Sequence, residues 1–291
     1  MNILITGISG RIGANVAKAY ADAGHHVRGL VWSNDLRTDK LAGLQAELIE
    51  GSLVDMDDVR RAVEGADAIC HLGAAFQGGG PFTNEDYFEI NVRGTFNMLE
   101  AAVQFAPNLQ HFFFASSDAL YSKYLPAGIP EPIREDEMPL EPGGSYALTK
   151  LLGEDLCRGY LRNSGLPVTI FRFALTVSTD EILTFRQFYL SHWIAAYSNK
   201  RSEAATALSQ RMLDVQAAAG GKEVLVIARD ESGRSYKKHI ADVRDIVAGF
   251  TAALGQRSVV GETFQLASPT PFTWEETIPY LAANSTCRPQ I

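Results

Sequence analysis

A tyrosine and a lysine four residues apart, Tyr146 and Lys150, are the residues of this 291-residue chain best suited to acid–base chemistry. The sequence around them has a helical pattern, so both side chains should lie on one face of a helix. A free tyrosine is a poor base because its pKa is about 10. A neighbouring ammonium, helped by the positive charge of an oxidised nicotinamide, would favour the phenolate and lower that pKa. Tyr146 could then take or return a hydroxyl proton while a hydride moves at the adjoining carbon.

Ser117 is the third candidate for catalysis. It follows an apolar run at residues 110–115 that predicts a buried strand. Open α/β sheets bind ligands beyond the carboxyl ends of their strands, so Ser117 could hydrogen-bond the same substrate oxygen as Tyr146. A Y-x-x-x-K pair by itself is weak evidence, because most such pairs are solvated helix residues. The hypothesis rests on the combination of the pair with Ser117 and a glycine-rich loop.

That glycine-rich loop, G-x-x-G-x-x-G, lies between a predicted strand at 2–6 and a predicted helix at 12–23. Its first glycine permits a tight turn, and its second lets the backbone approach a pyrophosphate without a Cβ in the way. The third allows close packing of the helix on the strand, with the helix N-terminus facing the anion. The alternative is that the glycines serve a tight turn only. The context favours a dinucleotide site, for which the candidate residues are Gly7, Ser9, Gly10, Arg11, Ile12 and Gly13.

The elements that must position these residues alternate between short apolar runs and helical patterns. We expect strands at 2–6, 26–32, 46–49, 68–72, 110–115 and 168–173, and helices at 12–23, 56–63, 88–106 and 145–164. Such alternation is typical of βαβ units and a parallel sheet. Three glycines and a proline predict a loop at 78–81. The sequence therefore predicts an α/β fold with a doubly wound parallel sheet.

The pattern changes after residue 173. Residues 181–219 are mostly helical in composition, followed by a strand at 223–228, a helix at 240–254 and a short strand at 263–266. Thr273, with Glu276 three residues later, forms a capping box that predicts the start of a last helix. We expect a nucleotide-binding domain at 1–175 and a small substrate-binding lobe at 176–291, interleaved with the end of the core sheet.

The composition excludes several classes of protein. A net charge of -8 argues against a nucleic-acid surface, which needs clustered lysine and arginine. No apolar run approaches the ~20 residues that span a bilayer, and the N-terminus lacks the pattern of a signal peptide. The scattered Cys70, Cys157 and Cys287 fit neither a disulfide framework nor a zinc site. We expect a cytoplasmic protein with a small-molecule substrate, and no metal, nucleic-acid partner or membrane contact.

Taken together, these residues resemble the extended short-chain dehydrogenase/reductase family, of the NAD(P)-dependent epimerase/dehydratase type. The resemblance covers nearly the whole chain. Besides the glycine loop and the Tyr146/Lys150 pair, it rests on His71-Leu72-Gly73-Ala74-Ala75, Asn91-Val92-Arg93-Gly94-Thr95, Ala115-Ser116-Ser117-Asp118-Ala119-Leu120-Tyr121 and His239-Ile240-Ala241-Asp242-Val243. It implies a Rossmann-type fold with Tyr146 as the base and Ser117 polarising the substrate. Lys150 would orient both Tyr146 and the nicotinamide ribose.

The same resemblance implies further contacts to the cofactor. Asp55, after the third strand, would lie near the adenine-binding segment. Gly73 and Ala74 would lie against the cofactor. Asn91 would either contact it or fix the loop behind the site. The second helix of a pair at 88–106 and 145–164 would carry Leu151, Leu152, Leu156 and Leu161 into a four-helix seam, which implies a homodimer.

The choice between NAD and NADP depends on the end of the second strand, where NAD enzymes of this type place an acid that binds the ribose 2′-hydroxyl. Val31 occupies that position, Ser33 follows as a candidate contact, and the nearest acid is Asp35. Arg37 and Lys40 are close, although not at the usual NADP position. The missing acid favours NADP slightly. The alternative is that Asp35 reaches back to the ribose.

Departures from the family pattern bear on the substrate. The family usually has an asparagine, which contacts substrate phosphates, three residues after the arginine that closes the sixth strand; here Leu175 follows Arg172 at that spacing. A buried diphosphate needs hydrogen-bond donors, and leucine has none. Arg234 could bind a diphosphate instead. His192, which lies beside an aromatic-rich helical stripe, is a further candidate for substrate contact.

Asp118 is a third substrate candidate, because the resemblance to 4,6-dehydratases includes this position. Those enzymes follow the aspartate with a glutamate, which here is Ala119, so dehydration is disfavoured. The sequence therefore favours an NAD(P)-dependent oxidoreductase acting on a secondary alcohol or ketone of a sugar-like or other small carbonyl compound without a nucleotide. The alternatives are a nucleotide-sugar epimerase and, in a different class, a non-catalytic NAD(P)-sensing protein.

Overall fold

The computed structural model describes residues 1–33, 35–76, 82–122, 133–230, 232–235 and 237–284. The chain divides into two compact units, one formed by Met1–Thr176 with Ala241–Ala267 and the other by Val177–Ile240 with Ser268–Ile291. Each unit is described by itself. The segment 78–81, for which the sequence predicts a loop, lies outside the described residues.

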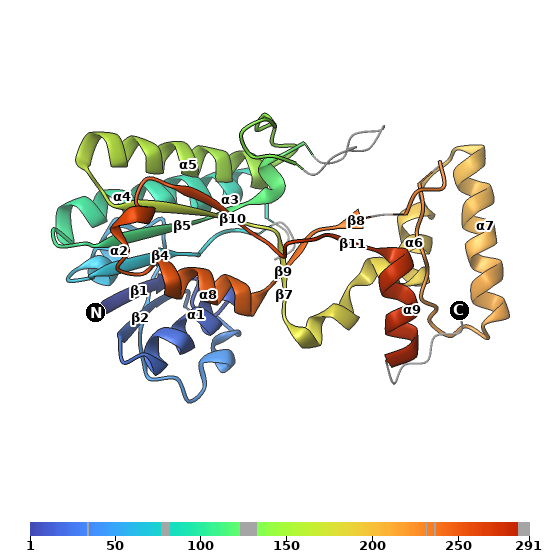
Figure 1. Ribbon diagram of the computed structural model, residues 1–291, viewed down its shortest axis with the longest axis horizontal. Helices are drawn as coiled ribbons and strands as arrows, with labels where there is room; N and C mark the ends of the chain where they lie inside the picture. The colour runs from blue at the N-terminus through green and yellow to red at the C-terminus, as the bar shows by residue number, and fades with distance from the viewer. Residues whose placement is uncertain (34, 77–81, 123–132, 231, 236, 285–291) are drawn as a thin grey trace. The chain divides into compact units, whose positions relative to one another are not determined.

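A seven-stranded sheet is the centre of the first unit, with the strand order β10-β6-β5-β4-β1-β2-β3 (Figure 1). All of its pairs are parallel. The strands are β1 (Asn2–Thr6), β2 (His26–Val31), β3 (Ala46–Glu50), β4 (Ala68–His71), β5 (His111–Ser117), β6 (Val168–Phe173) and β10 (Thr263–Leu266). The strand order reverses at β1, between β2 and β4, which is where doubly wound sheets bind ligands beyond their carboxyl ends. The predicted fold class is confirmed.

Helices cover both faces of this sheet. On one face lie α1 (Arg11–Asp22) and α8 (Val243–Ala253), and on the other lie α2 (Met56–Val63), α4 (Gly94–Phe105) and α5 (Ser145–Ser164) (Figure 1). Successive side chains of a strand point to opposite faces. Ile3 and Ile5 of β1 therefore pack with the first pair of helices, whereas Leu4 packs with the second group.

The helix expected at 88–106 starts earlier and is not a regular α-helix throughout. It begins as α3 (Asn84–Phe88), passes through a π-helical turn (Glu89–Arg93) and continues as α4. Thr83 and Asp86 form a capping box that starts α3. The π-helical turn contains Asn91, and such turns are frequent at functional sites.

The second unit contains α6 (Leu190–Tyr197), α7 (Glu203–Ala218) and α9 (Trp274–Asn284), with short 3₁₀ turns at Thr179–Thr184 and Arg186–Phe188. Its small core comprises Phe188, Leu225, Trp274, Ile278 and Leu281. β8 (Lys237–Lys238) pairs antiparallel with β11 (Phe272–Thr273). Thr273 and Glu276 bond each other's backbone amides, so the predicted cap of the last helix is confirmed.

Two expectations for the C-terminal part of the chain are wrong in detail. The strand expected at 223–228 does not form, because Leu225 makes only an isolated bridge, to Tyr189. Burial of Val224 and Leu225 accounts for the apolar pattern that suggested a strand. The segment expected as a helix from residue 240 begins as β9 (Ile240–Asp242), which pairs with β7 (Leu175–Val177), and α8 starts at Val243. Among the described residues, no helix has the length and apolar character needed to cross a membrane.

Candidate active site

The glycine loop joins β1 to α1 at the point where the strand order reverses. Gly7 has a φ of +67°, and a Cβ on it would lie 2.8 Å from the backbone nitrogen of Gly73. A Cβ on Gly13 would lie 2.2 Å from the carbonyl oxygen of Gly7, so the helix packs against the loop more closely than any other residue would allow. No side chain caps α1 and its first turn has no acid, which leaves its N-terminal amides open to an anion. This geometry fits the pyrophosphate of a dinucleotide.

Asp35 lies against this loop although it follows the end of β2 by four residues. Ser9 donates a hydrogen bond to the Asp35 carboxylate (2.5 Å), and Arg37 binds that carboxylate through Nε and Nη2 at 2.9 and 3.0 Å. The Asp35 side chain is only 8% exposed. Hydrogen bonds from Arg37, with a further one from Ser9, hold the pKa of Asp35 well below its usual range. The neighbouring Arg11 donates from Nη1 to the carbonyl of Thr176 (2.6 Å).

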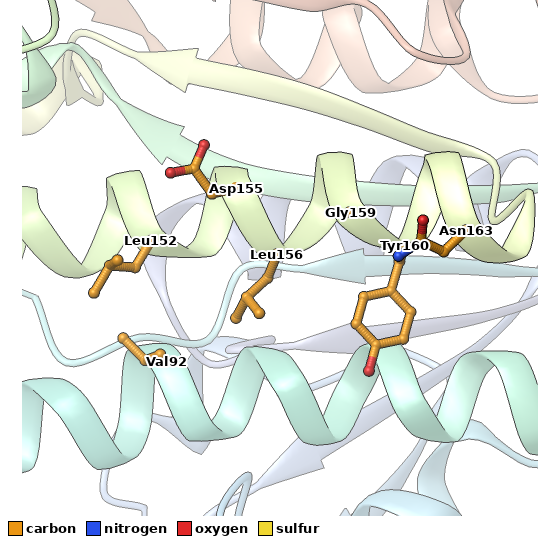
Figure 2. Close-up of a pocket in the computed structure, with 7 residues that line it drawn as sticks. All are labelled: Val92, Leu152, Asp155, Leu156, Gly159, Tyr160 and Asn163. Carbon is orange, nitrogen blue, oxygen red and sulfur yellow. The ribbon is translucent and has the colours of Figure 1, made fainter.

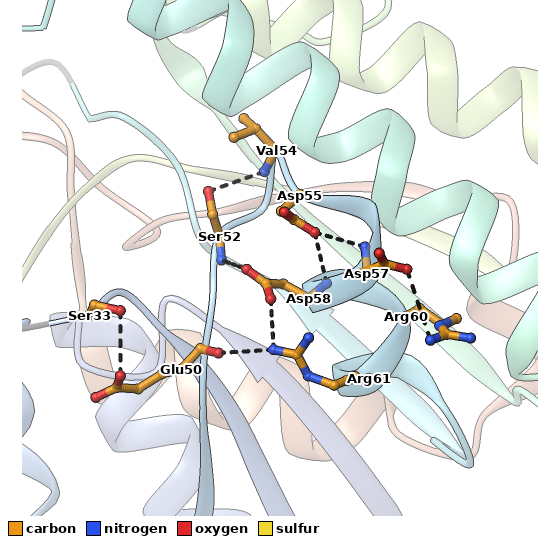
Figure 3. Close-up of polar contacts among 9 residues, drawn as sticks. All are labelled: Ser33, Glu50, Ser52, Val54, Asp55, Asp57, Asp58, Arg60 and Arg61. Atoms are coloured by element: carbon orange, nitrogen blue, oxygen red, sulfur yellow. Dashed lines mark hydrogen bonds and ion pairs between the residues drawn. The ribbon is translucent and has the colours of Figure 1, made fainter.

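Ser33 and Asp55 have local partners at the ends of β2 and β3 (Figure 3). Ser33 is exposed and donates weakly to Glu50 (3.4 Å). Asp55 caps α2, because its Oδ1 accepts from the backbone amides of Asp57 and Asp58 at 2.9 and 3.1 Å. The structure thus gives Asp55 Oδ1 a capping role at the start of α2. The signal was present in the sequence, since an acid three residues after a capping residue marks a helix start.

The loop after β4 is held at both ends by buried side chains. The backbone amide of Gly73 donates to Thr6 Oγ1 (2.9 Å). The Asn91 side chain accepts from the Ala75 amide (2.7 Å) and donates to the Ala75 carbonyl (3.1 Å) and to Thr149 (3.0 Å). Asn91, 3% exposed, therefore fixes the loop that contains Gly73 and Ala74, which is one of the two roles considered for it.

Ser117, Tyr146 and Lys150 come together at the carboxyl end of β5. Ser117 is the last residue of the strand, and its side chain lies close enough to the Tyr146 hydroxyl to lower the pKa of that tyrosine. Tyr146 and Lys150 lie one turn apart near the start of α5. Lys150, only 5% exposed, donates from Nζ to the Ala115 carbonyl (2.7 Å) and lies over the Phe114 ring. The site therefore combines a phenol that can donate a proton, a serine hydroxyl and a lysine ammonium. The serine is at the end of β5, and the other two lie one turn apart on α5.

Burial dominates the protonation of this group. It raises the pKa of Tyr146 to about 12, against a smaller lowering by the hydrogen bond to Ser117 and with Asp118 raising it further. Burial also lowers the pKa of Lys150 to about 8, opposed by Cys157 and Glu154. Burial therefore favours the protonated form of Tyr146 over the phenolate, and Lys150 Nζ donates to β5.

Two aromatic rings meet Tyr146 edge-on. The ring centroids of Phe76 and Tyr87 lie 5.6 and 6.4 Å from that of Tyr146. Phe76 is 50% exposed, so an accessible apolar side chain lies beside the candidate catalytic tyrosine. Neither ring belongs to a recognisable spacing in the sequence, and neither is among the residues expected at the site.

A buried ion pair lies directly behind the site. Glu154, fully buried and one turn after Lys150, accepts from Arg172 Nε and Nη2 at 2.8 and 2.7 Å, from Ser116 Oγ at 2.6 Å and from Arg158 at 2.6 Å. Four donors saturate its two oxygens. Burial alone raises the pKa of Glu154, but the bonds from Arg172 and Ser116 outweigh it and hold that pKa below its usual value. The pair ties α5 to β5 and β6.

Other proteins share this arrangement of sequence motifs. The model of the NAD dependent epimerase/dehydratase family matches residues 3–267. The chain belongs to this family. The match confirms the resemblance drawn from the sequence.

Among curated relatives, the chain is 32% identical over 178 residues to GDP-mannose 3,5-epimerase 1 of Oryza sativa subsp. japonica, covering 60% of this chain and 46% of that protein. It is 34% identical over 187 residues to a probable UDP-glucuronate 4-epimerase of Rhizobium meliloti (strain 1021), covering 60% and 52%. The matches thus span about half the length of these relatives.

Among solved structures, a short-chain dehydrogenase/reductase superfamily protein from Agrobacterium tumefaciens with bound NAD is similar, with a TM-score of 0.80 and 33% identity over 97% of this chain and 82% of that one. UDP-glucuronic acid 4-epimerase from Bacillus cereus, at 21% identity over 97% and 82% of the two chains, shares the fold with a TM-score of 0.71.

The three substrate candidates of this family member have different surroundings. Asp118 lies close enough to Tyr146 for its charge to raise the tyrosine pKa. His192, on α6, meets Trp193 edge-on at 5.4 Å between ring centroids. Arg234 binds Asp230 through Nε (2.7 Å). His192 and Arg234 belong to the second unit and Asp118 to the first.

A hollow of about 410 Å³ lies apart from the catalytic group, on the outer side of the two long helices (Figure 2). Its lining residues are Val92, Leu152, Asp155, Leu156, Gly159, Tyr160 and Asn163. None of them is a catalytic candidate, so the hollow is not the active site. Elsewhere in the part of the chain that the structure describes, no group of three histidine, cysteine or acidic side chains gathers as metal ligands would.

Proposed function

We propose that this protein catalyses NAD-dependent hydride transfer at a secondary alcohol or ketone of a sugar-like or other small carbonyl substrate. The observation that supports this most directly is the position of Ser117, at the carboxyl end of β5 and beside Tyr146, with Lys150 one turn further along α5. Sites at that end of a doubly wound sheet are where its ligands bind.

The residues divide the chemistry among them. Bound nicotinamide would accept or supply the hydride. Ser117 and Tyr146 would both hydrogen-bond the substrate oxygen, and Tyr146 would transfer its proton. A tyrosine with a pKa of about 12 is ready to protonate the alkoxide that forms in reduction. In oxidation the Lys150 ammonium and the charge of an oxidised nicotinamide would favour loss of that proton.

The geometry supports NAD rather than the NADP that the sequence slightly favoured. The Asp35 carboxylate lies against Ser9 of the glycine loop and accepts four hydrogen bonds, and a ribose 2′-hydroxyl would take the place of the one from Ser9. A 2′-phosphate at the same place would meet a carboxylate of the same charge. The guanidinium of Arg37, the nearest cation, is already bound by Asp35.

Nucleotide-sugar epimerisation is the second candidate, and the names of the relatives favour it. Against it, Leu175 supplies no donor to a diphosphate, and Arg172 is engaged with Glu154 and Tyr121. We therefore place direct oxidation or reduction of a smaller substrate first. Epimerisation uses the same transfer of hydride and proton but leaves no net change in NADH.

A ligand panel separates these candidates. Thermal shift is measured with NAD present for UDP-, GDP- and dTDP-sugars, free sugars and sugar acids, and each stabilising compound is then followed for NADH formation. Stabilisation by free sugars or sugar acids with net NADH formation is the expected result. Stabilisation by nucleotide sugars alone, with an isomer formed and no net NADH, would establish the epimerase. Tight NADH binding without turnover of any compound would favour a sensing role.

The outer faces of α4 and α5 support assembly into a homodimer. Phe96 and Val103 of α4 and Leu148 of α5 are 42%, 41% and 48% exposed. Phe96 meets the ring of Tyr160, which lines the hollow of Figure 2. Apolar side chains grouped on two adjacent helices are typical of a surface that another helix pair covers. The same two helices of a second chain would complete a four-helix seam.

A further inference from the structure

His71 occupies a buried position between the two cofactor loops of the first unit. It is the last residue of β4 and is 1% exposed. Its Nδ1 lies 2.8 Å from Thr6 Oγ1, directly before the glycine loop, and its Nε2 lies 3.0 Å from Thr95 Oγ1 on α4. Nothing in the catalytic scheme uses this imidazole.

The direction of each hydrogen bond around His71 follows from its neighbours. Thr6 Oγ1 accepts from the Gly73 amide (2.9 Å) and keeps its own hydrogen, which it can donate to His71 Nδ1 when that nitrogen carries no hydrogen. Thr95 donates to the Asn91 carbonyl (2.6 Å), so it must accept from His71 Nε2. One state satisfies every group: a neutral imidazole with its hydrogen on Nε2.

Protonation of His71 would break this pattern. A hydrogen on Nδ1 would displace that of Thr6, for which the described residues offer no other acceptor. Burial also lowers the pKa of His71 to about 3, and the charge of Lys150 acts in the same direction. The other groups against the ring are the uncharged Phe112 and Phe114. The neutral state therefore persists throughout the physiological pH range.

The hydrogen-bond partners of His71 are connected to both ends of the segment 72–75. Through Thr6 it fixes the Gly73 amide, and through Thr95 it meets the carbonyl of Asn91, whose side chain fixes Ala75. Thr6 also helps to hold the glycine loop, because Gly7 follows it directly. Gly7 approaches Gly73 so closely that a Cβ on Gly7 would collide with it. We propose that His71 is a positioning residue that sets the glycine loop and the segment 72–75 at the spacing needed for the dinucleotide. This inference rests on the proposed function.

Replacement of His71 tests this role through cofactor affinity, without any substrate. His71→Phe keeps the size of the ring but leaves the Thr6 hydrogen and the Thr95 acceptor without partners. We expect it to weaken NADH binding about tenfold in a fluorescence titration, the change in affinity that loss of one to two hydrogen bonds gives. His71→Asn places an amide oxygen near the position of Nδ1, where it can accept from Thr6, and should retain most of the affinity. His71→Gln reaches only Thr95 and should behave like His71→Phe.

His111→Phe is the matched control. His111 is also 1% exposed and lies in the same sheet, but at the amino end of β5, away from the cofactor loops. Its replacement should change thermal stability without changing NADH affinity. If His71→Phe binds NADH within about twofold of the wild type, or if His71→Asn is no better than His71→Phe, the positioning role is wrong. Failure of the wild type itself to bind NADH would overturn the proposed function and this inference together.

A second measurement reports on the imidazole directly. Long-range ¹H–¹⁵N spectra of histidine-labelled protein should show the His71 ring neutral with its hydrogen on Nε2 from about pH 8 to about pH 5, a range in which free histidine becomes charged. The assignment comes from the signal lost in His71→Asn. A ring that gains charge near its ordinary pKa, or that has its hydrogen on Nδ1, would contradict the proposed network.

Discussion

At the scale of single residues, the proposed function depends on the proton of Tyr146. Tyr146→Phe removes that proton but leaves the glycine loop intact, so NADH binding should be unchanged. Turnover of the substrate found in the panel should fall about 10²–10⁴-fold, the usual contribution of a positioned acid or base. Stopped-flow measurement of NADH consumption gives this rate. Full activity in the variant would exclude Tyr146 as the proton donor.

The pH dependence of the wild-type reduction rate is a second test of the role of Tyr146. Because the pKa of Tyr146 is about 12, the phenol stays protonated and should not limit reduction below that pH. Lys150 has a lowered pKa of about 8 and loses its charge as the pH rises through that value. The rate of reduction should therefore fall above about pH 8, and Tyr146→Phe should lack this dependence in its residual rate.

Asp35 should decide the choice of cofactor. With a carboxylate beside the ribose, NADH should bind at least about tenfold more tightly than NADPH, which corresponds to about 1.4 kcal/mol. Asp35→Asn removes the charge and frees Arg37, so the affinity for NADPH should rise and that for NADH should fall. Fluorescence titration with both cofactors measures this. Equal affinities in the wild type would contradict the assignment to NAD. Asp39→Asn, at an exposed acid nearby, is the control.

At the scale of elements, the site depends on how α5 is fixed to β5 and β6. Gly153 allows the closest approach, since a Cβ there would lie 2.4 Å from Phe114 Cζ. One turn after Lys150, Glu154 binds Ser116 and Arg172, which are paired in the register of the two strands. Ser117 on the strand and Tyr146 on the helix therefore meet at a distance set by these contacts.

Glu154→Gln should destabilise the protein strongly. It leaves Arg172 buried with a neutral amide in place of its carboxylate, and breaking a buried pair in this way costs about 3–5 kcal/mol. Urea unfolding measures the difference. Glu154→Leu combined with Arg172→Met removes both charges and should recover most of the stability. A loss below about 1 kcal/mol in Glu154→Gln would show that the pair contributes little. Asp57→Asn, at an acid of α2 whose side chain is 82% exposed, should have little effect.

At the scale of the whole molecule, the apolar outer faces of α4 and α5 should be covered by a second chain. Leu152→Arg places a charge in the hollow of Figure 2 and should convert a dimer into monomers. Light scattering at micromolar concentration gives the mass directly. Leu208→Arg, at an exposed residue of α7, should leave the mass unchanged. A monomeric wild type would exclude the dimer.

The sequence by itself determined what is encoded by local spacing. Alternating short strands and helices predicted the doubly wound sheet, and all six strands expected in the first 175 residues are present, with ends shifted by one or two residues. The glycine loop and the cap at Thr273 were readable for the same reason, because each involves neighbours within a few positions. Ser117, Tyr146 and Lys150 were found because strand ends and helix turns place them in a fixed relation.

The tertiary structure decided what depends on contacts between distant segments. No local sequence pattern predicts that Glu154 pairs with Arg172, that His71 lies between Thr6 and Thr95, or that Asp35 contacts Ser9. Residues 223–228 have the composition of a strand but no partner ladder, so their apolar side chains pack without one. The pKa of Tyr146 is a further example, because burial raises it and no spacing in the sequence shows how deeply the ring is buried. Burial and hydrogen-bond partners are properties of the folded chain, and no spacing in the sequence specifies them.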